Sequence, residues 1–273
     1  MHLLVIPYPA IDPVAIHLGP VAVKWYGLAY MAGLLLGWLY IKRLLRKPEL
    51  WPRGCVPFEP AKADDLLLWM TLGVLLGGRL GYVLFYDPGY FFSHPLEIPA
   101  VWHGGMSFHG ALLGCILVIW QFARRNGVAT WSVLDLCAAA TPIGLFFGRL
   151  ANFVNAELWG RPSDVPWSMV FPGAGPVPRH PSQLYEALLE GLVLFAVLAW
   201  LTYGPKALRK PGVIGGSFML GYGLARSFAE FFREPHYGHA LNIGPLTPGI
   251  IYSLPMIALG LWALITRARA RAT

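Results

Sequence analysis

The sequence from residue 66 to residue 85 reads LLLWMTLGVLLGGRLGYVLF and contains one charged side chain, that of Arg79. At a rise of about 1.5 Å per helical residue, such a run spans the roughly 30 Å hydrocarbon core of a bilayer. Lipid offers no hydrogen bonds to an open backbone, so a lipid-exposed run of this composition must be helical. The stretch therefore predicts a transmembrane helix.

The rest of the chain repeats this pattern. Of the 273 residues, 56% are hydrophobic and 13% are charged, whereas a soluble domain carries about a quarter charged residues. The predicted fold class is all-α: a polytopic membrane protein with about seven transmembrane helices, in which residues 1–273 form a single integral membrane domain. The predicted spans are Val21–Ile41, Leu66–Phe85, Met106–Phe122, Val133–Leu150, Leu184–Leu201, Val213–Phe232 and Pro248–Ile265.

The basic residues near the span ends are distributed unevenly between the two sides of the membrane. One side carries fourteen Lys and Arg residues and the other carries four, and the richer side is expected to face the cytoplasm. The N-terminus is therefore predicted to lie outside and the C-terminus in the cytoplasm. The fourteen are Lys42, Arg43, Arg46, Lys47, Arg53, Lys62, Arg124, Arg125, Lys206, Arg209, Lys210, Arg267, Arg269 and Arg271; the four are Lys24, Arg161, Arg179 and Arg233.

The segments predicted to lie outside the cytoplasm are residues 1–20, 87–105, 151–183 and 233–247. They are rich in Pro, Gly and aromatic residues, which favour turns over helical periodicity. The longest segment, 151–183, is predicted to form a small extracytoplasmic cap made of loops.

Composition also argues against several kinds of site. The formal net charge is +7, but no basic face interleaved with aromatic residues is evident, so nucleic acid is not an expected partner. Cys55, Cys115 and Cys137 have neither metal-ligand spacing nor a disulfide pattern. His236 and His239 lack a third ligand, so no metal and no other cofactor is expected. The first residues lack the features of a removable signal peptide.

Three basic residues, Arg79, Arg149 and Arg226, lie within or at the end of apolar runs. An arginine costs roughly 2.5–3.5 kcal/mol at the centre of a span, so each needs a structural or functional reason. All three are placed in the outer half of the bilayer by their position in the predicted spans. The glycines around Arg79 fit close helix packing, so a structural and a functional role are equally open for that residue.

Arg149 and Arg226 lie among other polar residues, which favours a function. Arg226 shares a helix face with Tyr222 and Glu230, one turn away on either side. Planar guanidinium groups bind phosphate bidentately, and a phosphate at this depth is most naturally that of a phospholipid headgroup. Further polar residues expected at the same depth are Asn152, Asn155, Glu157, His180, Glu186 and Glu190.

His109 lies near the start of the third predicted span, two residues after Ser107 and its hydroxyl. Its unperturbed pKa of about 6.5 suits a general base. Glu186, Glu230 and a water molecule are alternative bases. A hydrolase with Ser107 as nucleophile, His109 as base and Glu186 as orienting acid is a lesser alternative, because no strand precedes the serine.

Four blocks of sequence together resemble the prolipoprotein diacylglyceryl transferases of bacteria. They occur in order over nearly the whole chain, with Trp25-Tyr26-Gly27 in the first span. The blocks are Gly104-Gly-Met-Ser-Phe-His-Gly110, Gly148-Arg-Leu-Ala-Asn-Phe-Val-Asn-Ala-Glu-Leu-Trp-Gly-Arg161, Arg179-His-Pro-Ser-Gln-Leu-Tyr-Glu186 and Gly221-Tyr-Gly-Leu-Ala-Arg-Ser-Phe-Ala-Glu-Phe-Phe-Arg233.

The resemblance implies a seven-span enzyme of the bacterial inner (cytoplasmic) membrane. Such an enzyme transfers the diacylglyceryl group of phosphatidylglycerol to the lipobox cysteine in the signal peptide of a prolipoprotein. A thioether forms and glycerol 1-phosphate is released, which is the first step of bacterial lipoprotein maturation. By motif position, Arg149 and Arg226 bind the lipid phosphate, and the residues that line the site are Tyr26, His109, Asn152, Glu157, Gly160 and Glu230.

The residues and the resemblance together give one set of predicted roles. Catalytic roles are predicted for His109, Arg149, Arg226 and Glu230. Substrate-binding roles are predicted for Tyr26, Arg149, Asn152, Asn155, Glu157, Gly160, His180, Glu186, Tyr222 and Arg226. No covalent nucleophile is evident, so the hypothesis is direct displacement of the phosphate by the substrate thiolate.

Two other classes of function stay open from the sequence. A transporter or flippase for a phosphorylated lipid would use the same arginines for recognition, although the polar groups form no path across the membrane. A structural membrane subunit would use the polar residues to hold its helices together.

Overall fold

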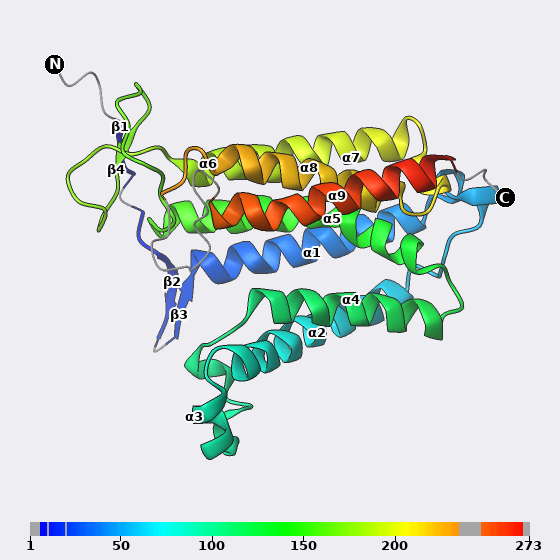
Figure 1. Cartoon of the computed structure of the whole chain (residues 1–273), viewed down its shortest axis with the longest axis horizontal. Helices are drawn as coiled ribbons and strands as arrows, with labels where there is room; N and C mark the ends of the chain where they lie inside the picture. The colour runs from blue at the N-terminus through cyan, green and yellow to red at the C-terminus, as the bar shows by residue number, and fades with distance from the viewer. Residues whose placement is uncertain (1–5, 10, 20, 235–246, 270–273) are drawn as a thin grey trace. The chain divides into compact units, whose positions relative to one another are not determined.

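The computed structural model describes residues 6–9, 11–19, 21–234 and 247–269 (Figure 1). The chain divides into two compact units: a first unit of residues 1–40 and 135–273, and a second unit of residues 41–134. That the whole chain forms one integral membrane domain stays a prediction. His236 and His239 lie outside the described residues.

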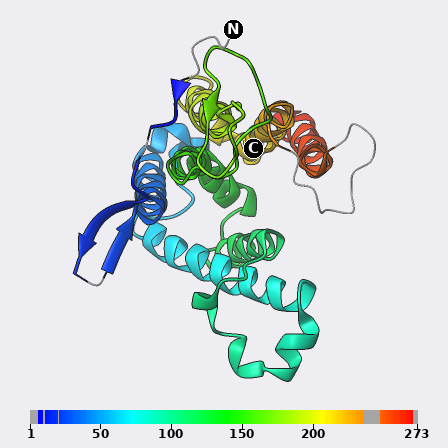
Figure 2. The same ribbon diagram turned by 90° about the vertical axis from the view of Figure 1, so that its left-hand side faces the viewer.

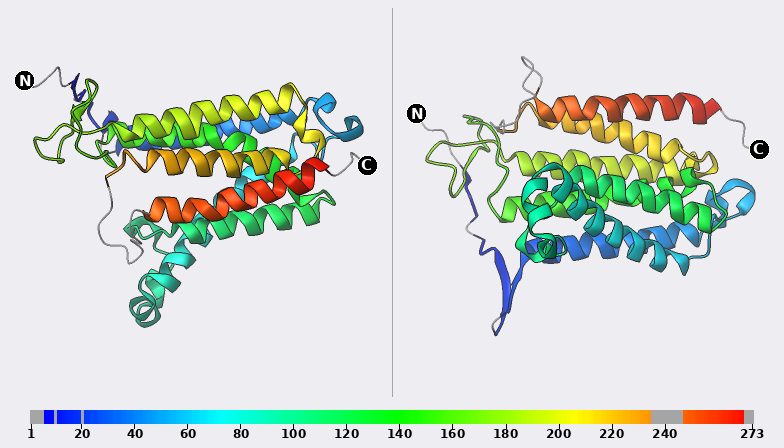
Figure 3. Two further views of the ribbon diagram at one scale, coloured as in Figure 1. Left: turned by 45° about the horizontal axis from the view of Figure 1, so that its top comes forward. Right: turned by 60° about the horizontal axis from the view of Figure 1, so that its bottom comes forward.

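Long helices make up most of the first unit, and they run side by side (Figures 1 and 3). α1 and α5 belong to this unit for most of their length. Its elements are β1 (Ile6–Pro7), β2 (Val14–Leu18), β3 (Val21–Lys24), α1 (Trp25–Leu45), α5 (Thr130–Val154), β4 (Met169–Val170), α6 (Ser182–Glu186), the π-helical segment η5 (Ala187–Val193), α7 (Leu194–Tyr203), η6 (Ala207–Arg209), α8 (Val213–Ala229) and α9 (Pro248–Arg269).

The second unit consists of a helix pair, α2 and α4, and short helical turns. Asp64 and Asp65 lie in the first turn of α2, where the helix dipole favours negative charge. The elements are η1 (Pro48–Leu50), η2 (Pro52–Gly54), α2 (Lys62–Phe85), α3 (Pro88–Ser93), η3 (Pro95–Glu97), η4 (Val101–His103) and α4 (Phe108–Arg125).

The prediction of a helical, polytopic membrane protein is confirmed. Among the described residues, five helical segments are long and apolar enough to cross a membrane; α4 and α8 occupy the two remaining predicted spans, and α8 has 17 residues. The count of seven spans therefore stays a prediction. The five segments are Trp25–Leu45, Lys62–Phe85, Thr130–Val154, Ser182–Tyr203 and Pro248–Arg267.

Three predicted span ends are wrong. The third predicted span begins at Met106, but α4 begins at Phe108, after its N-cap Ser107. Val21–Lys24 form β3, which pairs antiparallel with β2 in a hairpin (Figure 2), because alternating β-branched residues fit a two-stranded ribbon as well as a helix end. The sixth predicted span continued to Phe232, but α8 ends at Ala229. Arg226 consequently lies in the last turn of its helix.

The predicted cap segment, residues 151–183, consists mainly of turns and short strand pairings between α5 and α6. β4 pairs in parallel with β1, so the start of the described chain contributes to it. Arg179 forms isolated bridges with Pro162 and Met169. The location of this segment outside the membrane stays a prediction.

Glycines allow close approach of helices in both units. In the first unit, a Cβ on Gly260 of α9 would meet the amide N of Leu220 at 2.6 Å. In the second unit, a Cβ on Gly81 of α2 would meet the Cα of Gly110 of α4 at 2.8 Å. Small residues at such positions are the usual basis of helix association in membranes. The close packing predicted from the glycines near Arg79 is thus confirmed.

Arg79 has a structural role in the second unit. Its Nε donates to Ile98 O at 2.7 Å, its Nη1 to Gly104 O at 2.6 Å and its Nη2 to Glu97 O at 2.7 Å. The guanidinium carbon also lies 4.9 Å from the ring centroid of Phe91. Arg79 therefore satisfies the carbonyls of the irregular segment between α3 and α4, which supports the structural alternative.

Asp135 fixes the start of α8. Its fully buried carboxylate accepts hydrogen bonds from the amides of Gly212 and Gly215, both at 2.7 Å. The first amides of a helix have no intrahelical partner, and the positive end of the helix dipole favours a negative charge. α5 thus determines where α8, the helix of Arg226, begins.

Candidate active site

Arg149 lies near the C-terminal end of α5 and is held by two glutamates. Its Nε and Nη2 donate to the Oε2 of Glu190 at 3.2 and 3.0 Å, and its Nη1 lies 3.1 Å from the Oε2 of Glu186. Both carboxylates are fully buried. Contacts on both sides of the guanidinium fix its plane, so Arg149 presents its remaining N–H donors in a set direction.

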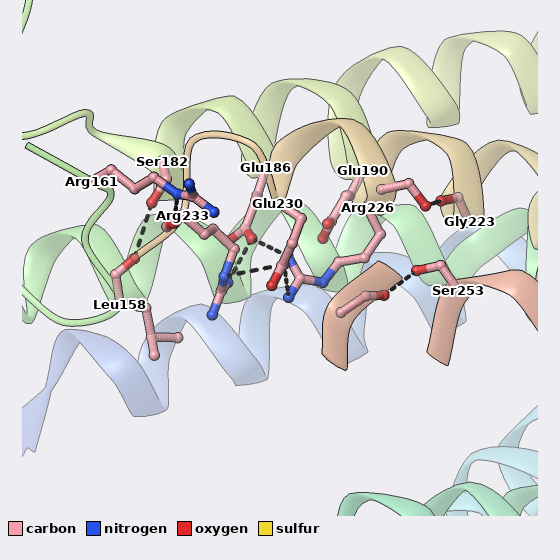
Figure 4. Close-up of polar contacts among 12 residues, drawn as sticks. Leu158, Arg161, Ser182, Glu186, Glu190, Gly223, Arg226, Glu230, Arg233 and Ser253 are labelled. Atoms are coloured by element: carbon pink, nitrogen blue, oxygen red, sulfur yellow. Dashed lines mark hydrogen bonds and ion pairs between the residues drawn. The ribbon is translucent and has the colours of Figure 1, made fainter. Parts of the chain in front are cut away.

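Glu186 joins three arginines that come from different parts of the chain. Its Oε1 accepts from Arg226 Nη1 at 3.0 Å and from Arg233 Nη1 at 2.6 Å (Figure 4). Its Oε2 lies 3.1 Å from Arg149 Nη1. One carboxylate on α6 therefore gathers guanidinium groups from α5, from α8 and from the turn after α8.

Glu230 completes this group of charges. Arg226 Nη2 lies 2.7 Å from Glu230 Oε2. A Cβ on Gly249 would collide with the Glu230 carboxylate, so the carboxylate lies against the first turn of α9, where the helix dipole favours its charge. The arginine–glutamate cluster is defined as Arg149, Arg226, Arg233, Glu186, Glu190 and Glu230.

Three positive and three negative groups make the arginine–glutamate cluster formally neutral. Buried charges need such pairing, because an isolated charge in a low-dielectric interior costs several kcal/mol. A guanidinium has five N–H donors, and among the described residues Arg226 directs one at Glu186 and one at Glu230. The cluster can therefore hold its own shape and still offer donors to a further anion.

The stretch after Arg149 ends α5 in a Schellman cap. Ala156 N donates to Phe153 O at 2.9 Å and Glu157 N donates to Asn152 O at 3.0 Å, the two bonds that define this cap. Asn152 Nδ2 also donates to Glu157 Oε1 at 2.8 Å. The predicted site residues Asn152 and Glu157 are thus brought together by the helix end itself.

Ala156 occupies the left-handed position of this cap, with φ of +53°. Glycine is the usual residue there because a Cβ is unfavourable in this conformation. Ala156→Gly should therefore increase the free energy of unfolding by about 1 kcal/mol, measured as a rise in the thermal unfolding midpoint of the purified protein. Ala151→Gly, inside the same helix, should lower that midpoint by a comparable amount. A lower midpoint for Ala156→Gly would contradict the cap.

Gly160 joins this stretch to the segment that carries Arg233. Its amide donates to His180 O at 2.9 Å, and it forms a β-bridge with Arg233. A Cβ on Gly160 would collide with Phe232 O and lie 2.7 Å from His180 O. Only glycine fits between the backbones of Phe232 and His180, which is a structural reason for the glycine at position 160.

The other predicted residues of the first unit differ in how they relate to the cluster. The Tyr222 hydroxyl is close enough to interact electrostatically with four residues of the cluster, Arg149, Arg226, Glu186 and Glu190. The Tyr26 hydroxyl interacts in the same way with Arg149 and Glu157. Tyr26 also shares a hydrogen bond of 3.1 Å with Tyr30. Asn155 lies in the Schellman turn, but its side chain makes no hydrogen bond within the described part of the chain.

His180 lies in the cap segment and contacts Tyr185. Trp167 Nε1 donates to the Tyr185 hydroxyl at 2.7 Å, and the same hydroxyl shares a hydrogen bond of 3.1 Å with His180 Nδ1. Burial lowers the pKa of His180 from its ordinary value, so its imidazole is neutral near pH 7. These contacts support the loop rather than the arginine–glutamate cluster.

Ser107 and His109 belong to the second unit. Ser107 is the N-cap of α4, and its Oγ accepts a hydrogen bond from Gly110 N at 3.2 Å. This capping role explains the serine and disfavours the hydrolase with Ser107 as nucleophile. His109 lies in the first turn of α4 with its ring against Phe108, and its proximity to the arginines stays a prediction.

Sequence reasoning missed three residues. Arg233 was counted only as a basic residue outside the spans, although its spacing of three residues from Glu230 could have placed it on the same side of the chain. Ser182 and Gln183 lie in the third of the resembling blocks but have no predicted role, yet both are fully buried. Among the residues that the structure describes, no group of three or more His, Cys, Asp or Glu side chains is placed to hold a metal ion.

The fold is that of a polytopic membrane protein, and it brings three arginines and three glutamates together in one formally neutral cluster. A profile of the prolipoprotein diacylglyceryl transferase family matches residues 13–266. The chain belongs to this family.

Curated relatives match over nearly their full length. The phosphatidylglycerol–prolipoprotein diacylglyceryl transferase of Rhizobium meliloti (strain 1021) is 55% identical over 271 residues, which is 99% of this chain and 96% of the relative. The protein of the same name from Brucella canis (strain ATCC 23365 / NCTC 10854 / RM-666) is 55% identical over 267 residues, or 97% of this chain and 95% of the relative. The Mesorhizobium japonicum protein of that name is 54% identical over 263 residues, or 96% and 92%.

Proposed function

We propose that this chain transfers the diacylglyceryl group of phosphatidylglycerol to the lipobox cysteine in the signal peptide of prolipoproteins, the first step of lipoprotein maturation. Membership of the family and the names of the curated relatives support this activity. The single structural observation that carries it is Glu186, which gathers Arg149, Arg226 and Arg233 around one carboxylate. Such a set of guanidinium donors suits a phosphate.

The reaction is a displacement at carbon. The sulfur of the cysteine thiolate forms a bond to the glycerol carbon of the diacylglyceryl group, and the bond from that carbon to the phosphate oxygen breaks. Glycerol 1-phosphate leaves with the bonding electrons, and the thiol proton passes to a base. Arginine donors fixed before the reaction stabilise the charge that grows on the departing phosphate, and Arg149 and Arg226 have this role in the proposal.

Glu186 has a positioning role in this proposal rather than the role of a base. Its carboxylate contacts three guanidinium groups, so its oxygens are occupied in holding the arginines. Asn152, Glu157 and Tyr26 line the site beside Arg149, and Tyr222 and Glu230 line it beside Arg226. The proposal also keeps substrate-binding roles for His180 and Asn155.

His109 is the proposed base. His109→Gln should lose most activity near pH 7, because the substrate thiol is then mainly protonated. Part of the activity should return above about pH 8.5, where a thiol ionises unaided. The measurement is the rate against pH for both proteins, with detergent-solubilised enzyme of equal purity. A rate that stays equally low at all pH values would instead indicate that His109 positions substrate.

The decisive experiment combines purified protein, phosphatidylglycerol and a lipobox peptide. Mass spectrometry should detect the peptide with one diacylglyceryl group in thioether linkage, together with released glycerol 1-phosphate. A peptide whose cysteine is replaced by serine is the matched control. No mass gain on the cysteine peptide would refute transfer, and movement of labelled lipid between leaflets without bond breaking would favour the flippase alternative.

The membrane orientation is part of the proposal. The chain is a multi-pass membrane protein, and the excess of Lys and Arg at one set of span ends supports an N-terminus outside and a cytoplasmic C-terminus. The arginine–glutamate cluster then lies in the outer leaflet of the bacterial inner membrane. This is the leaflet in which an exported prolipoprotein would present its lipobox cysteine.

A further inference from the structure

Leu158 has a left-handed backbone that the helix end does not explain. Its φ is +58°, a conformation that residues with a Cβ avoid because the Cβ approaches the following carbonyl oxygen. The Schellman cap of α5 accounts for the left-handed Ala156 but does not extend to Leu158. Residues in this conformation persist where neighbouring structure holds them, and they concentrate at functional sites.

Two buried side chains of α6 hold the peptide groups on either side of Leu158. Gln183 Nε2 donates to Glu157 O at 2.6 Å, which fixes the peptide plane before Leu158. Ser182 Oγ donates to Leu158 O at 3.1 Å, which fixes the plane after it (Figure 4). The φ and ψ of a residue are the rotations of these two planes about its Cα. Both donors are fully buried, so water does not compete for the bonds.

Leu158 connects two anchored parts of the site. On one side, Glu157 is tied to α5 by its amide and by the hydrogen bond from Asn152. On the other side, Gly160 is tied to Arg233 by a β-bridge, and Arg233 belongs to the arginine–glutamate cluster. The backbone angles of Leu158 therefore set how the Asn152–Glu157 pair lies relative to Arg233.

We propose that Gln183 and Ser182 are positioning residues of the transfer reaction: by holding Leu158 they fix the Asn152–Glu157 pair relative to the arginine–glutamate cluster. The expected effect of these residues on the rate of transfer rests on the proposed function. Glu186 lies on the same short helix, α6. The short helix α6 thus holds the arginines through Glu186 and the left-handed Leu158 through Ser182 and Gln183.

The test is Gln183→Met, which keeps the size of the side chain but removes its N–H donors. We expect kcat for transfer to fall at least tenfold, with KM for phosphatidylglycerol within about twofold, since the arginines stay in place. Amide hydrogen exchange should become faster in residues 156–160 and stay unchanged in α9. Gln121→Met, the same change on an exposed face of α4, should alter neither kcat nor exchange.

Rescue separates positioning from a general loss of folded protein. Glycine adopts the left-handed conformation without a Cβ penalty, so in a Leu158→Gly background Gln183→Met should reduce kcat less than about threefold. An equal tenfold loss in both backgrounds, or unchanged exchange in residues 156–160, would overturn the proposal. If Gln183→Met does not accumulate in membranes, Ser182→Ala is measured against the same two criteria. Should the unmodified protein fail to transfer at all, the proposed function falls, while the exchange data still decide whether Gln183 holds Leu158.

Discussion

Arg149→Ala and Arg226→Ala should each abolish diacylglyceryl transfer, with a loss of about a thousandfold or more. Removing a single fixed donor to a developing oxyanion costs roughly 2.7–4 kcal/mol, and a guanidinium supplies more than one donor. Arg149→Lys and Arg226→Lys keep the charge but lose the planar fork, so we expect a smaller loss for these variants, of about ten- to a hundredfold. The measurement is kcat and KM for phosphatidylglycerol with a lipobox peptide.

Removal of Arg149 should also lower the free energy of unfolding, so a control variant must separate this loss of stability from the loss of catalysis. Glu190 accepts both of its described hydrogen bonds from Arg149, and a buried carboxylate without its partner costs about 3–5 kcal/mol. The double variant Arg149→Ala with Glu190→Ala restores charge balance in the cluster. It should unfold at a higher temperature than Arg149→Ala alone but remain inactive. Transfer at the unmodified rate by this double variant would remove Arg149 from the mechanism.

Gly160→Ala should be nearly inactive, with a rate at least a hundredfold lower. The added Cβ collides with Phe232 O and comes within 2.7 Å of His180 O, and backbone atoms cannot move aside as a flexible side chain can. Separation of these segments displaces Arg233 from Glu186, because Gly160 and Arg233 are bridged.

Gly148 provides the matched control for Gly160. It lies in the same block of sequence, but a Cβ there meets nothing within 4 Å. Gly148→Ala should keep its transfer rate within about twofold and gain about 0.5–1 kcal/mol of stability in the helix. Equal activity of Gly160→Ala and Gly148→Ala would show that the close approach at Gly160 is not needed for turnover.

The membrane helices could be predicted because the bilayer imposes one length and one composition on every span. The β2–β3 hairpin could not be predicted, because Val21-Ala-Val23 is as apolar as the start of a span. That these residues form a strand is evident only from their pairing with Val14–Leu18. Boundaries were uncertain for the same reason at Phe232, where apolar residues continue past the end of α8.

Arg149 and Arg226 could be identified because an arginine in an apolar run is costly and needs a reason. Arg233 follows the end of the predicted sixth span, where an arginine costs little, so its place in the cluster depends on contacts that no local pattern encodes. The same holds for Gln183, whose hydrogen bond joins residues 26 positions apart. Long-range contacts of this kind follow from how α6 lies against the segments after α5 and α8, not from the sequence near either residue.

The π-helical segment η5 has a consequence for how this helix can vary. Glu186 and Glu190 face the arginines at its start, while Leu194 and Leu198 are buried beyond it. A π-helical turn takes up one residue more than an α-helical turn, so η5 sets how Leu194 and Leu198 are turned about the helix axis relative to Glu186 and Glu190. The same turn places Glu190 against Arg149 and Gly191 against Phe146, where a Cβ would lie 2.8 Å from the Phe146 Cα, so η5 constrains both its own geometry and the identity of these two residues.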